Sequence, residues 1–101
     1  MALGGRSLAV LFADVAGSSA LYERLGDAEA LRAVERCLNR VERAAASYGG
    51  RLIKTIGDGA MIVFDSAETG LLGACEMQQR VGDLPPVSGV KLAVRDRKSV
   101  V

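Results

Sequence analysis

A glycine-rich turn between two short apolar runs is the feature that most constrains how this chain folds. Residues 52–64 read LIKTIGDGAMIVF, and Gly57, Asp58 and Gly59 separate the two runs. Each run has the length and the residue types of a β-strand, and Gly-Asp-Gly between strands is a strong signal for a tight turn. We therefore predict a β-hairpin with strands over residues 51–56 and 60–64.

Asp58, in the turn of this hairpin, has two alternative roles. Aspartate side chains in turns commonly bond to their own backbone, so Asp58 can serve the turn alone. Flanking glycines also leave room for a ligand, and a carboxylate is a suitable ligand for a hard divalent cation. Taken by itself, the hairpin favours the first role.

Lys54 interrupts an otherwise apolar set of side chains in the first strand of the hairpin. Because side chains alternate along a strand, Leu52, Lys54 and Ile56 are predicted to share one face. A lysine in this position is either an edge-strand charge that discourages aggregation or a group directed into a ligand site. The strand alone leaves both interpretations open.

Asp14 is a second candidate metal ligand, since it follows the unbroken apolar run of residues 8–13. Such a run is typical of a central strand that is covered on both faces. The small residues 15–19 then open a helix, whose free backbone N–H groups can face a phosphate while the carboxylate binds a cation. An equally good alternative is that Asp14 and Ser18 serve only as strand end and helix cap.

The remaining sequence alternates between helical and strand patterns. A short helix over residues 19–25 stops at Gly26, and Asp27 is the expected N-cap of a longer helix. The apolar stripe of that longer helix is predicted to contain Leu31, Val34, Leu38, Val41 and Ala45. A third helix is expected to begin at an Asp65–Glu68 capping box, with a stripe of Leu71, Ala74, Cys75 and Val81.

A last strand is predicted over residues 90–95, and residues 96–101 are expected to complete no further element. The order βααββαβ predicts an α+β fold, a ferredoxin-like or palm-like open sheet with its helices packed on one face. We expect a single domain over residues 1–101, with a disordered start at residues 1–7.

Composition restricts the classes of function that this chain can have. With 101 residues and 50% hydrophobic residues, it has room for one modest core. Its 13 basic and 12 acidic residues give a net charge of +1, which predicts no binding to nucleic acid or to an anionic membrane. No apolar run is long enough to span a bilayer, and residues 1–7 lack the pattern of a signal peptide, so we expect a cytoplasmic location.

The two cysteines, Cys37 and Cys75, have no CxxC spacing, and the chain contains no histidine. These facts argue against a zinc site and against a nucleophile that histidine activates. We expect both cysteines to be small buried apolar residues.

Two motifs at a particular separation make the chain resemble the class III nucleotidyl cyclase catalytic domain. They are LFADVAGS from residue 11 and KTIGDG from residue 54, followed by AMIVF. The combination of FxDxxGS, KxxGD and xxMxxF is specific, whereas either motif alone is not. The resemblance covers residues 8–95.

The resemblance implies a metal site and a phosphate site. In that family, two aspartates that match Asp14 and Asp58 bind two Mg²⁺ or Mn²⁺ ions, and the residue that matches Val15 supplies a backbone carbonyl. The family's phosphate loop matches Ala16, Gly17, Ser18 and Ser19. The implied reaction is in-line attack of the ribose 3′-hydroxyl of ATP on its α-phosphate, which forms cyclic AMP and pyrophosphate.

Lys54 matches the position that contacts the purine in adenylate cyclases, so the resemblance favours ATP over GTP. Members of the family build each site across a head-to-tail dimer, with metal ligands from one chain and purine-selecting residues from the other. The resemblance therefore implies a homodimer, or a heterodimer with a complete cyclase chain, in which Lys54 and Asp58 serve different sites.

The chain also departs from the family pattern. The family domain continues beyond Arg95 through a second purine contact, a ribose-orienting asparagine and a transition-state arginine, whereas residues 96–101 diverge here. We therefore expect the C-terminal part of the family domain to be missing and the chain alone to have little or no activity.

The alternative function is a non-catalytic module that binds nucleotide and metal, or mediates dimerisation, and pairs with a complete cyclase. A palm domain of the diguanylate cyclase type shares the predicted architecture. It is disfavoured because the chain has no GGDEF-like run and because Lys54 has no evident role in it.

Overall fold

The computed structural model describes residues 8–100, with side chains up to Ser99. The predicted disordered start at residues 1–7 lies outside the described residues. The elements in chain order are β1 (Ala9–Ala16), α1 (Ser18–Leu25), α2 (Asp27–Ala46), β2 (Arg51–Ile56), β3 (Gly59–Phe64), α3 (Ala67–Gly82) and β4 (Ala93–Val100).

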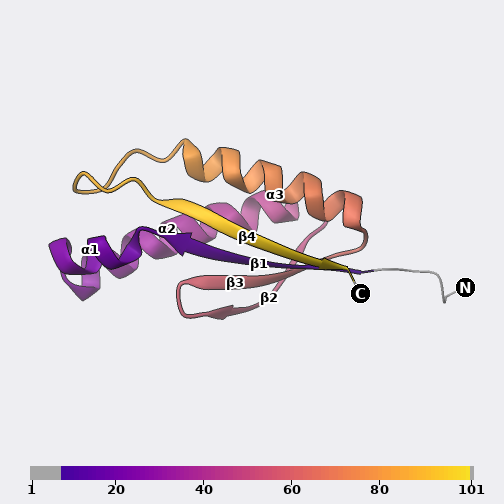
Figure 1. Ribbon diagram of the computed structural model, residues 1–101, viewed down its shortest axis with the longest axis horizontal. Coiled ribbons are helices and arrows are strands. Elements are labelled where there is room, and N and C mark those ends of the chain that lie inside the picture. The colour runs from indigo at the N-terminus through magenta and orange to yellow at the C-terminus, as the bar shows by residue number, and fades with distance from the viewer. Residues whose placement is uncertain (1–7, 101) are drawn as a thin grey trace, which may run out of the picture.

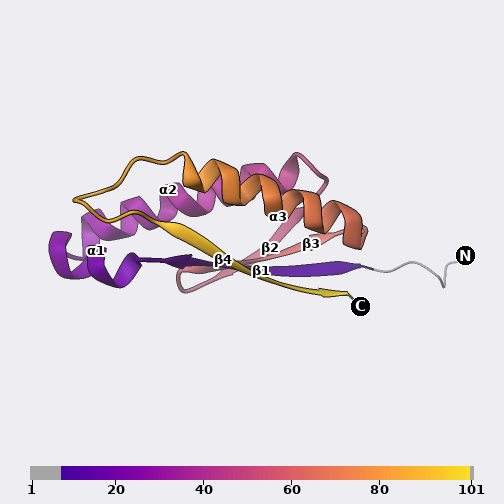
Figure 2. The same cartoon turned by 45° about the horizontal axis from the view of Figure 1, so that its top comes forward.

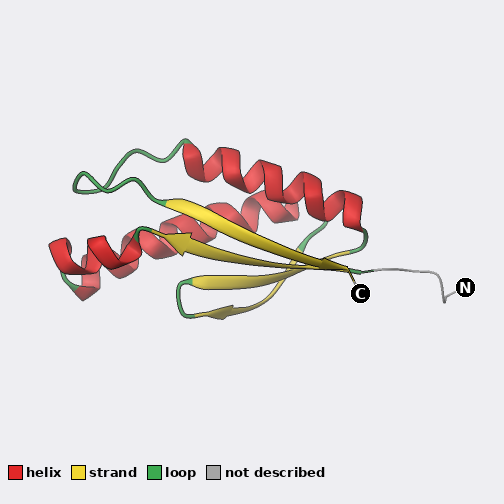
Figure 3. Ribbon diagram, in the orientation of Figure 1, coloured by secondary structure: helices red, strands yellow, loops and turns green. Residues whose placement is uncertain are grey.

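The four strands form one antiparallel sheet in the order β2-β3-β1-β4. Helices α2 and α3 lie side by side on one face of this sheet, and α1 packs against α2 near the end of β1 (Figures 1 and 2). In Figure 3, α2 and α3 run along the same side of the sheet, and α1 lies beyond the end of β1. The predicted α+β fold, an open sheet with helices on one face, is thus confirmed.

Alternating side chains of the two central strands form the floor of the core. Leu11 and Ala13 of β1 and Ile62 and Phe64 of β3 are almost completely buried beneath the helices. A Cβ atom at Gly73 of α3 would lie 2.6 Å from the Phe64 ring, so glycine is needed there for the helix to pack on the sheet.

Helix α2 is rotated slightly from its predicted orientation. Its buried residues are Ala30, Ala33, Val34, Cys37, Val41, Ala44 and Ala45. Leu31, predicted in the buried stripe, is 48% exposed, because small residues let α2 approach the sheet closely and leave this leucine at the margin. Burial raises the pKa of the Cys37 thiol to about 11.

Three predictions about helix α3 are wrong. Its N-cap is Ser66, whose hydroxyl accepts a hydrogen bond from the Thr69 N–H, so the predicted Asp65–Glu68 capping box is wrong. Leu71 and Cys75 are exposed rather than buried. The buried residues are instead Gly70, Gly73, Ala74, Met77 and Val81, because the glycine side of the helix is the one that accommodates Phe64.

Strand β4 begins later and runs further than predicted. The register pairs Asp14 with Arg95, Phe12 with Arg97 and Val10 with Ser99, so the segment that we expected to complete no element continues the strand to residue 100. Gln78 of α3 anchors this extension by donating hydrogen bonds to the Val94 carbonyl (2.7 Å) and to Asp96 Oδ1 (2.8 Å).

A register shift in β2 reverses the predicted face of Lys54. The shift lies between Leu52, which pairs with Ile62, and Lys54, which pairs with Met61. The extra residue, Ile53, is a β-bulge, and beyond it the side chains change faces. Leu52 and Thr55 consequently face α2, whereas Lys54 lies on the opposite side.

We call the sheet side away from α2 and α3 the open face. By register and burial it carries Val10, Phe12, Asp14, Lys54, Met61, Val63, Arg95 and Arg97. The Arg97 guanidinium lies 5.3 Å from the centre of the Phe12 ring, a cation–π contact on this face. No helix among residues 8–100 has the length and apolarity needed to cross a bilayer.

Candidate functional site

Asp58 is held by contacts far from it in sequence. Its backbone carbonyl accepts a hydrogen bond from the Val15 N–H at 3.0 Å. The Ser18 hydroxyl, in a residue only 8% exposed, donates to Asp58 Oδ2 at 2.8 Å across 40 positions of sequence. An aspartate that served the turn alone would need neither contact, so the β2–β3 turn is fastened to the junction of β1 and α1.

Asp14 lies at the same turn. It belongs to β1, which continues past the predicted end of the strand to Ala16, and it is the register partner of Gly59. A Cβ atom at residue 59 would collide with Asp14 Oδ1, so the carboxylate occupies space that only glycine leaves free. The structure therefore brings Asp14 and Asp58, 44 positions apart in the printed sequence, to one turn.

The first turn of α1 borders these two aspartates. Its N-cap is Gly17, which has a left-handed backbone (φ 96°), and no side chain caps the helix. Ser18, for which helix capping was one alternative, is instead inside the helix and bonds to Asp58. Helix N–H groups without a side-chain cap are suited to an anion.

Lys54 does not join the pair of aspartates within one chain. It is exposed on the open face beside Met61, and β3 separates its strand from that of Asp14. Two strand spacings amount to roughly 10 Å, so Lys54 and Asp14 are not neighbours in the sheet.

Arg95 was not identified as a site residue from the sequence. It is the register partner of Asp14 on β4 and is exposed on the same face. Side chains of directly opposed residues are about 5 Å apart at Cβ, so Arg95 brings a permanently charged side chain to the strand position opposite Asp14, although the two groups, both among the described residues, form no ion pair. Arg95 can be recognised as a neighbour of Asp14 only when the register that pairs β4 with β1 is known.

Tyr22 of α1 lies close enough to the carboxylates to respond to their charge. Partial burial, followed by the charges of Asp58, Asp27 and Glu35, raises the pKa of Tyr22, which lies one turn after Ser18 on α1. Within residues 8–100, no cluster of three or more His, Cys, Asp or Glu side chains is arranged to hold a metal ion. The donors available are therefore two carboxylates and neighbouring backbone and hydroxyl oxygens, a set that suits hard cations such as Mg²⁺.

Comparison with known proteins identifies the family. The model for the adenylate and guanylate cyclase catalytic domain matches residues 5–91. No curated protein matches the chain significantly. Solved structures do match, among them the dimeric guanylyl cyclase domain of the RhoGC fusion protein from the fungus Blastocladiella emersonii, with a TM-score of 0.82 and 18% identity.

Two other similar structures are a bacterial light-regulated adenylyl cyclase (TM-score 0.76, 19% identity) and the GGDEF domain of PA1120 from Pseudomonas aeruginosa (TM-score 0.77, 19% identity). The RhoGC domain matches 94% of this chain, the adenylyl cyclase 93% and the GGDEF domain 96%. In return, this chain spans 57% of the RhoGC structure, 30% of the adenylyl cyclase and 63% of the GGDEF structure. At such identities these structures show a shared fold alone. Because the family model matches well over half of the sequence, the chain belongs to the family of adenylate and guanylate cyclase catalytic domains.

Proposed function

We propose that this chain contributes the metal-binding and triphosphate-binding residues of a cyclase site that converts ATP to cyclic AMP and pyrophosphate. The observation that carries this proposal is the hydrogen bond from Ser18 to Asp58 beside the close approach of Asp14 to Gly59. Together these contacts gather two carboxylates from distant segments at one turn. Such convergence is expected of a binding site and has no evident purpose in a simple hairpin.

Asp14, Asp58 and the Val15 carbonyl are the residues proposed to hold two Mg²⁺ or Mn²⁺ ions. The donor set fits, because all three groups offer oxygen and because Gly59 leaves space around the Asp14 carboxylate. When bound, such ions activate the ribose 3′-hydroxyl and neutralise charge on the triphosphate. Ser18 occupies one oxygen of Asp58 and so fixes which oxygen faces the ligand.

The start of α1 and Arg95 are proposed to receive the triphosphate. Residues 16–19 present backbone N–H groups at an uncapped helix end, and Arg95 adds a side-chain cation opposite Asp14. In the proposed reaction the 3′-hydroxyl loses its proton to solvent and its oxygen forms a bond to the α-phosphorus, while the bond from that phosphorus to the oxygen bridging to the β-phosphate breaks and pyrophosphate leaves. The role of these donors is to align the chain of phosphates for that displacement.

Lys54 is proposed to select adenine in the site of a partner chain, either a second copy or a complete cyclase. Support for this role comes from the family match, because members of the family place the purine-selecting residue of one chain in the site of the other. A lysine ammonium is a donor only, and it complements the acceptor nitrogen that adenine presents where guanine presents an N–H. We therefore expect ATP rather than GTP to be the substrate.

The catalytic proposal is tested by mixing this chain with a complete cyclase domain whose own metal-binding aspartates are replaced by asparagine. With Mn²⁺ and ATP, we expect the mixture to form cyclic AMP when neither protein alone does, and Asp58→Asn in this chain to abolish the product. Asp65→Asn, on the exposed surface, is the matched control. A silent mixture, under conditions in which the unmodified complete domain turns over, contradicts the proposal.

A second candidate function is a non-catalytic module that binds metal and nucleotide, or mediates dimerisation, beside a complete cyclase. It is supported by the same two carboxylates and the same uncapped helix end, because these groups can bind metal and nucleotide without a chemical step. This alternative predicts that the same mixture associates in analytical ultracentrifugation and binds ATP but forms no cyclic nucleotide.

A further inference from the structure

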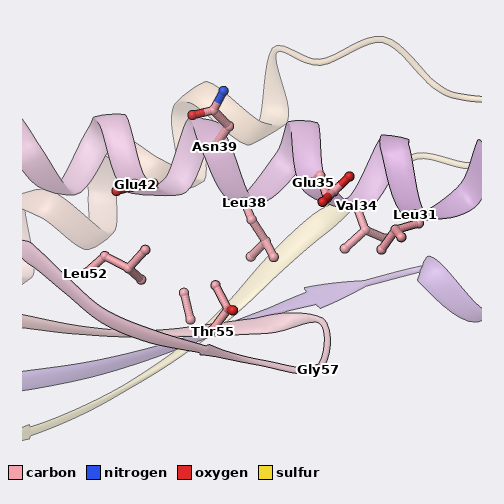
Figure 4. Close-up of a pocket in the computed structure, with 10 residues that line it drawn as sticks. Leu31, Val34, Glu35, Leu38, Asn39, Glu42, Leu52, Thr55 and Gly57 are labelled. Atoms are coloured by element: carbon pink, nitrogen blue, oxygen red, sulfur yellow. The ribbon is translucent and has the colours of Figure 1, made fainter.

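A groove separates α2 from the β2–β3 hairpin, on the helix side of the sheet at its β2 edge (Figure 4). Its volume is about 520 Å³, within the range of pockets that bind small organic molecules. The lining residues are Leu31, Val34, Glu35, Leu38, Asn39, Glu42, Leu52, Thr55, Gly57 and Ala60. In Figure 4, Leu31 and Leu38 point from α2 toward the hairpin, and Thr55 points back from β2.

The walls of the groove are apolar and accessible to water. Leu31 is 48% exposed, and Leu38 and Leu52 are only partly buried against the core. The bulge at Ile53 contributes to this arrangement, because it turns Thr55 rather than Lys54 toward α2. An apolar ligand would therefore remove leucine surface from water without displacing any part of the core.

The charge on the groove has one sign. Glu35 and Glu42 are seven positions apart, about two turns, so they lie on the same side of α2, and both line the groove together with the neutral Asn39. No lysine or arginine lines it, and within residues 8–100 neither glutamate forms a salt bridge. Two carboxylates above leucine side chains complement a molecule with an apolar body and a positive end.

We propose that this groove binds a small organic cation, a molecule with an apolar body that packs on Leu31, Leu38 and Leu52 and an ammonium or amidinium group beside Glu35 or Glu42. This inference does not depend on the proposed cyclase function. It does concern the same hairpin, because Gly57 lines the groove and is the neighbour of Asp58. A ligand in the groove is therefore expected to change the chemical environment of the β2–β3 turn, which carries Asp58 and lies against Asp14.

The test uses octylammonium as the probe and octanoate as a probe with the same chain length and the opposite charge. Each is titrated into the isotopically labelled 101-residue chain, and chemical shifts are followed by NMR. We expect octylammonium to give saturable shifts at Leu31, Leu38, Thr55 and Gly57, and octanoate to bind at least tenfold more weakly. Equal affinity for the two probes, or shifts centred on Phe12 and Met61 of the open face, overturns the proposal.

A pair of variants separates the ionic contribution from the apolar one. The double substitution Glu35→Gln and Glu42→Gln is expected to weaken octylammonium binding at least fivefold and to leave the affinity for neutral octanol unchanged. Glu29→Gln, on the exposed first turn of α2 outside the groove, is the matched control and should bind as the unmodified chain does. Identical octylammonium affinities for the double variant and the control contradict the assignment of the cation to these glutamates.

Discussion

At the scale of single residues, the hydrogen bond from Ser18 decides how Asp58 is presented. The hydroxyl is nearly buried and donates at 2.8 Å to one carboxylate oxygen. Hydrogen bonds to charged groups contribute about 1.5–3 kcal/mol, and part of this free energy goes into orienting the carboxylate. In the proposed cation site, Ser18 is therefore a positioning residue that acts through Asp58.

Ser18→Ala is expected to weaken Mn²⁺ binding by about tenfold, equivalent to about 1.4 kcal/mol, as measured by isothermal titration calorimetry. Ser18→Thr, which keeps the hydroxyl, should restore most of the affinity. Ser47→Ala, at the exposed end of α2 and outside the proposed site, is the control and should have no effect on Mn²⁺ affinity. Wild-type affinity in the Ser18→Ala protein contradicts the positioning role.

Gly59 determines the space available to Asp14, and two glycines of the same hairpin provide a controlled comparison. A methyl group at residue 59 collides with Asp14 Oδ1, whereas one at residue 57 meets nothing within 4 Å but must adopt φ 57°. Gly57→Ala should therefore cost about 1–2 kcal/mol of unfolding free energy and leave Mn²⁺ affinity nearly unchanged. Gly59→Ala should weaken Mn²⁺ binding at least tenfold. Equal Mn²⁺ affinities of the two variants would show that Gly59 does not determine the space around Asp14.

At the scale of elements, the positions of turns and strands were predictable where the local chemistry was strong. The Gly-Asp-Gly turn, both hairpin strands and the order of all seven elements follow from glycine placement and from hydrophobic periodicity. The bulge at Ile53 did not follow, because nothing local marks it; it is a consequence of how β2 registers against β3. Only part of the candidate site follows from the sequence. Motifs suggest Asp14 and Asp58, whereas Arg95 becomes a candidate only through the β1–β4 register.

The extension of β4 was missed because its sequence is charged, and charge there indicated an irregular end. In the structure, side-chain hydrogen bonds stabilise this charged segment as part of the strand, because Asp96 accepts hydrogen bonds from Gln78 and Lys98. Burial works against ionisation of Asp96, but these hydrogen bonds outweigh burial and lower its pKa. A lowered folded-state pKa stabilises the fold above the unfolded pKa near 3.8, and this contribution is lost as the pH falls through the folded value.

Asp96→Asn is accordingly expected to reduce the free energy of unfolding by about 1–2 kcal/mol at pH 7 and by clearly less at pH 3, below the unfolded-state pKa. Urea denaturation at the two pH values measures the difference. Asp65→Asn, which removes only an exposed 3.5 Å ion pair, should cost less than about 1 kcal/mol at pH 7. An Asp96 variant with the same deficit at both pH values shows that β4 is not anchored through this carboxylate.

At the scale of the whole molecule, the fold assigns its two sheet faces to different tasks. One face buries the core under α2 and α3, while the open face carries Asp14, Lys54 and Arg95 on three different strands. These residues are far apart in sequence, and only the strand order β2-β3-β1-β4 places them on one surface. The proposed functional residues of both sites, the chain's own and the partner's, thus depend on the complete sheet and not on either motif alone.

The central claim is that Asp14 and Asp58 form one cation site, and Mn²⁺ binding to the 101-residue chain tests it most directly. Isothermal titration calorimetry on the unmodified chain, Asp14→Asn, Asp58→Asn, the double variant and the surface control Asp65→Asn gives the comparison. We predict saturable binding to the unmodified chain and to the control, a loss of at least tenfold in each single variant, and little further loss in the double variant because the ligands share a site. Unchanged affinity in either single variant, or losses that simply add in the double variant, would contradict a shared site.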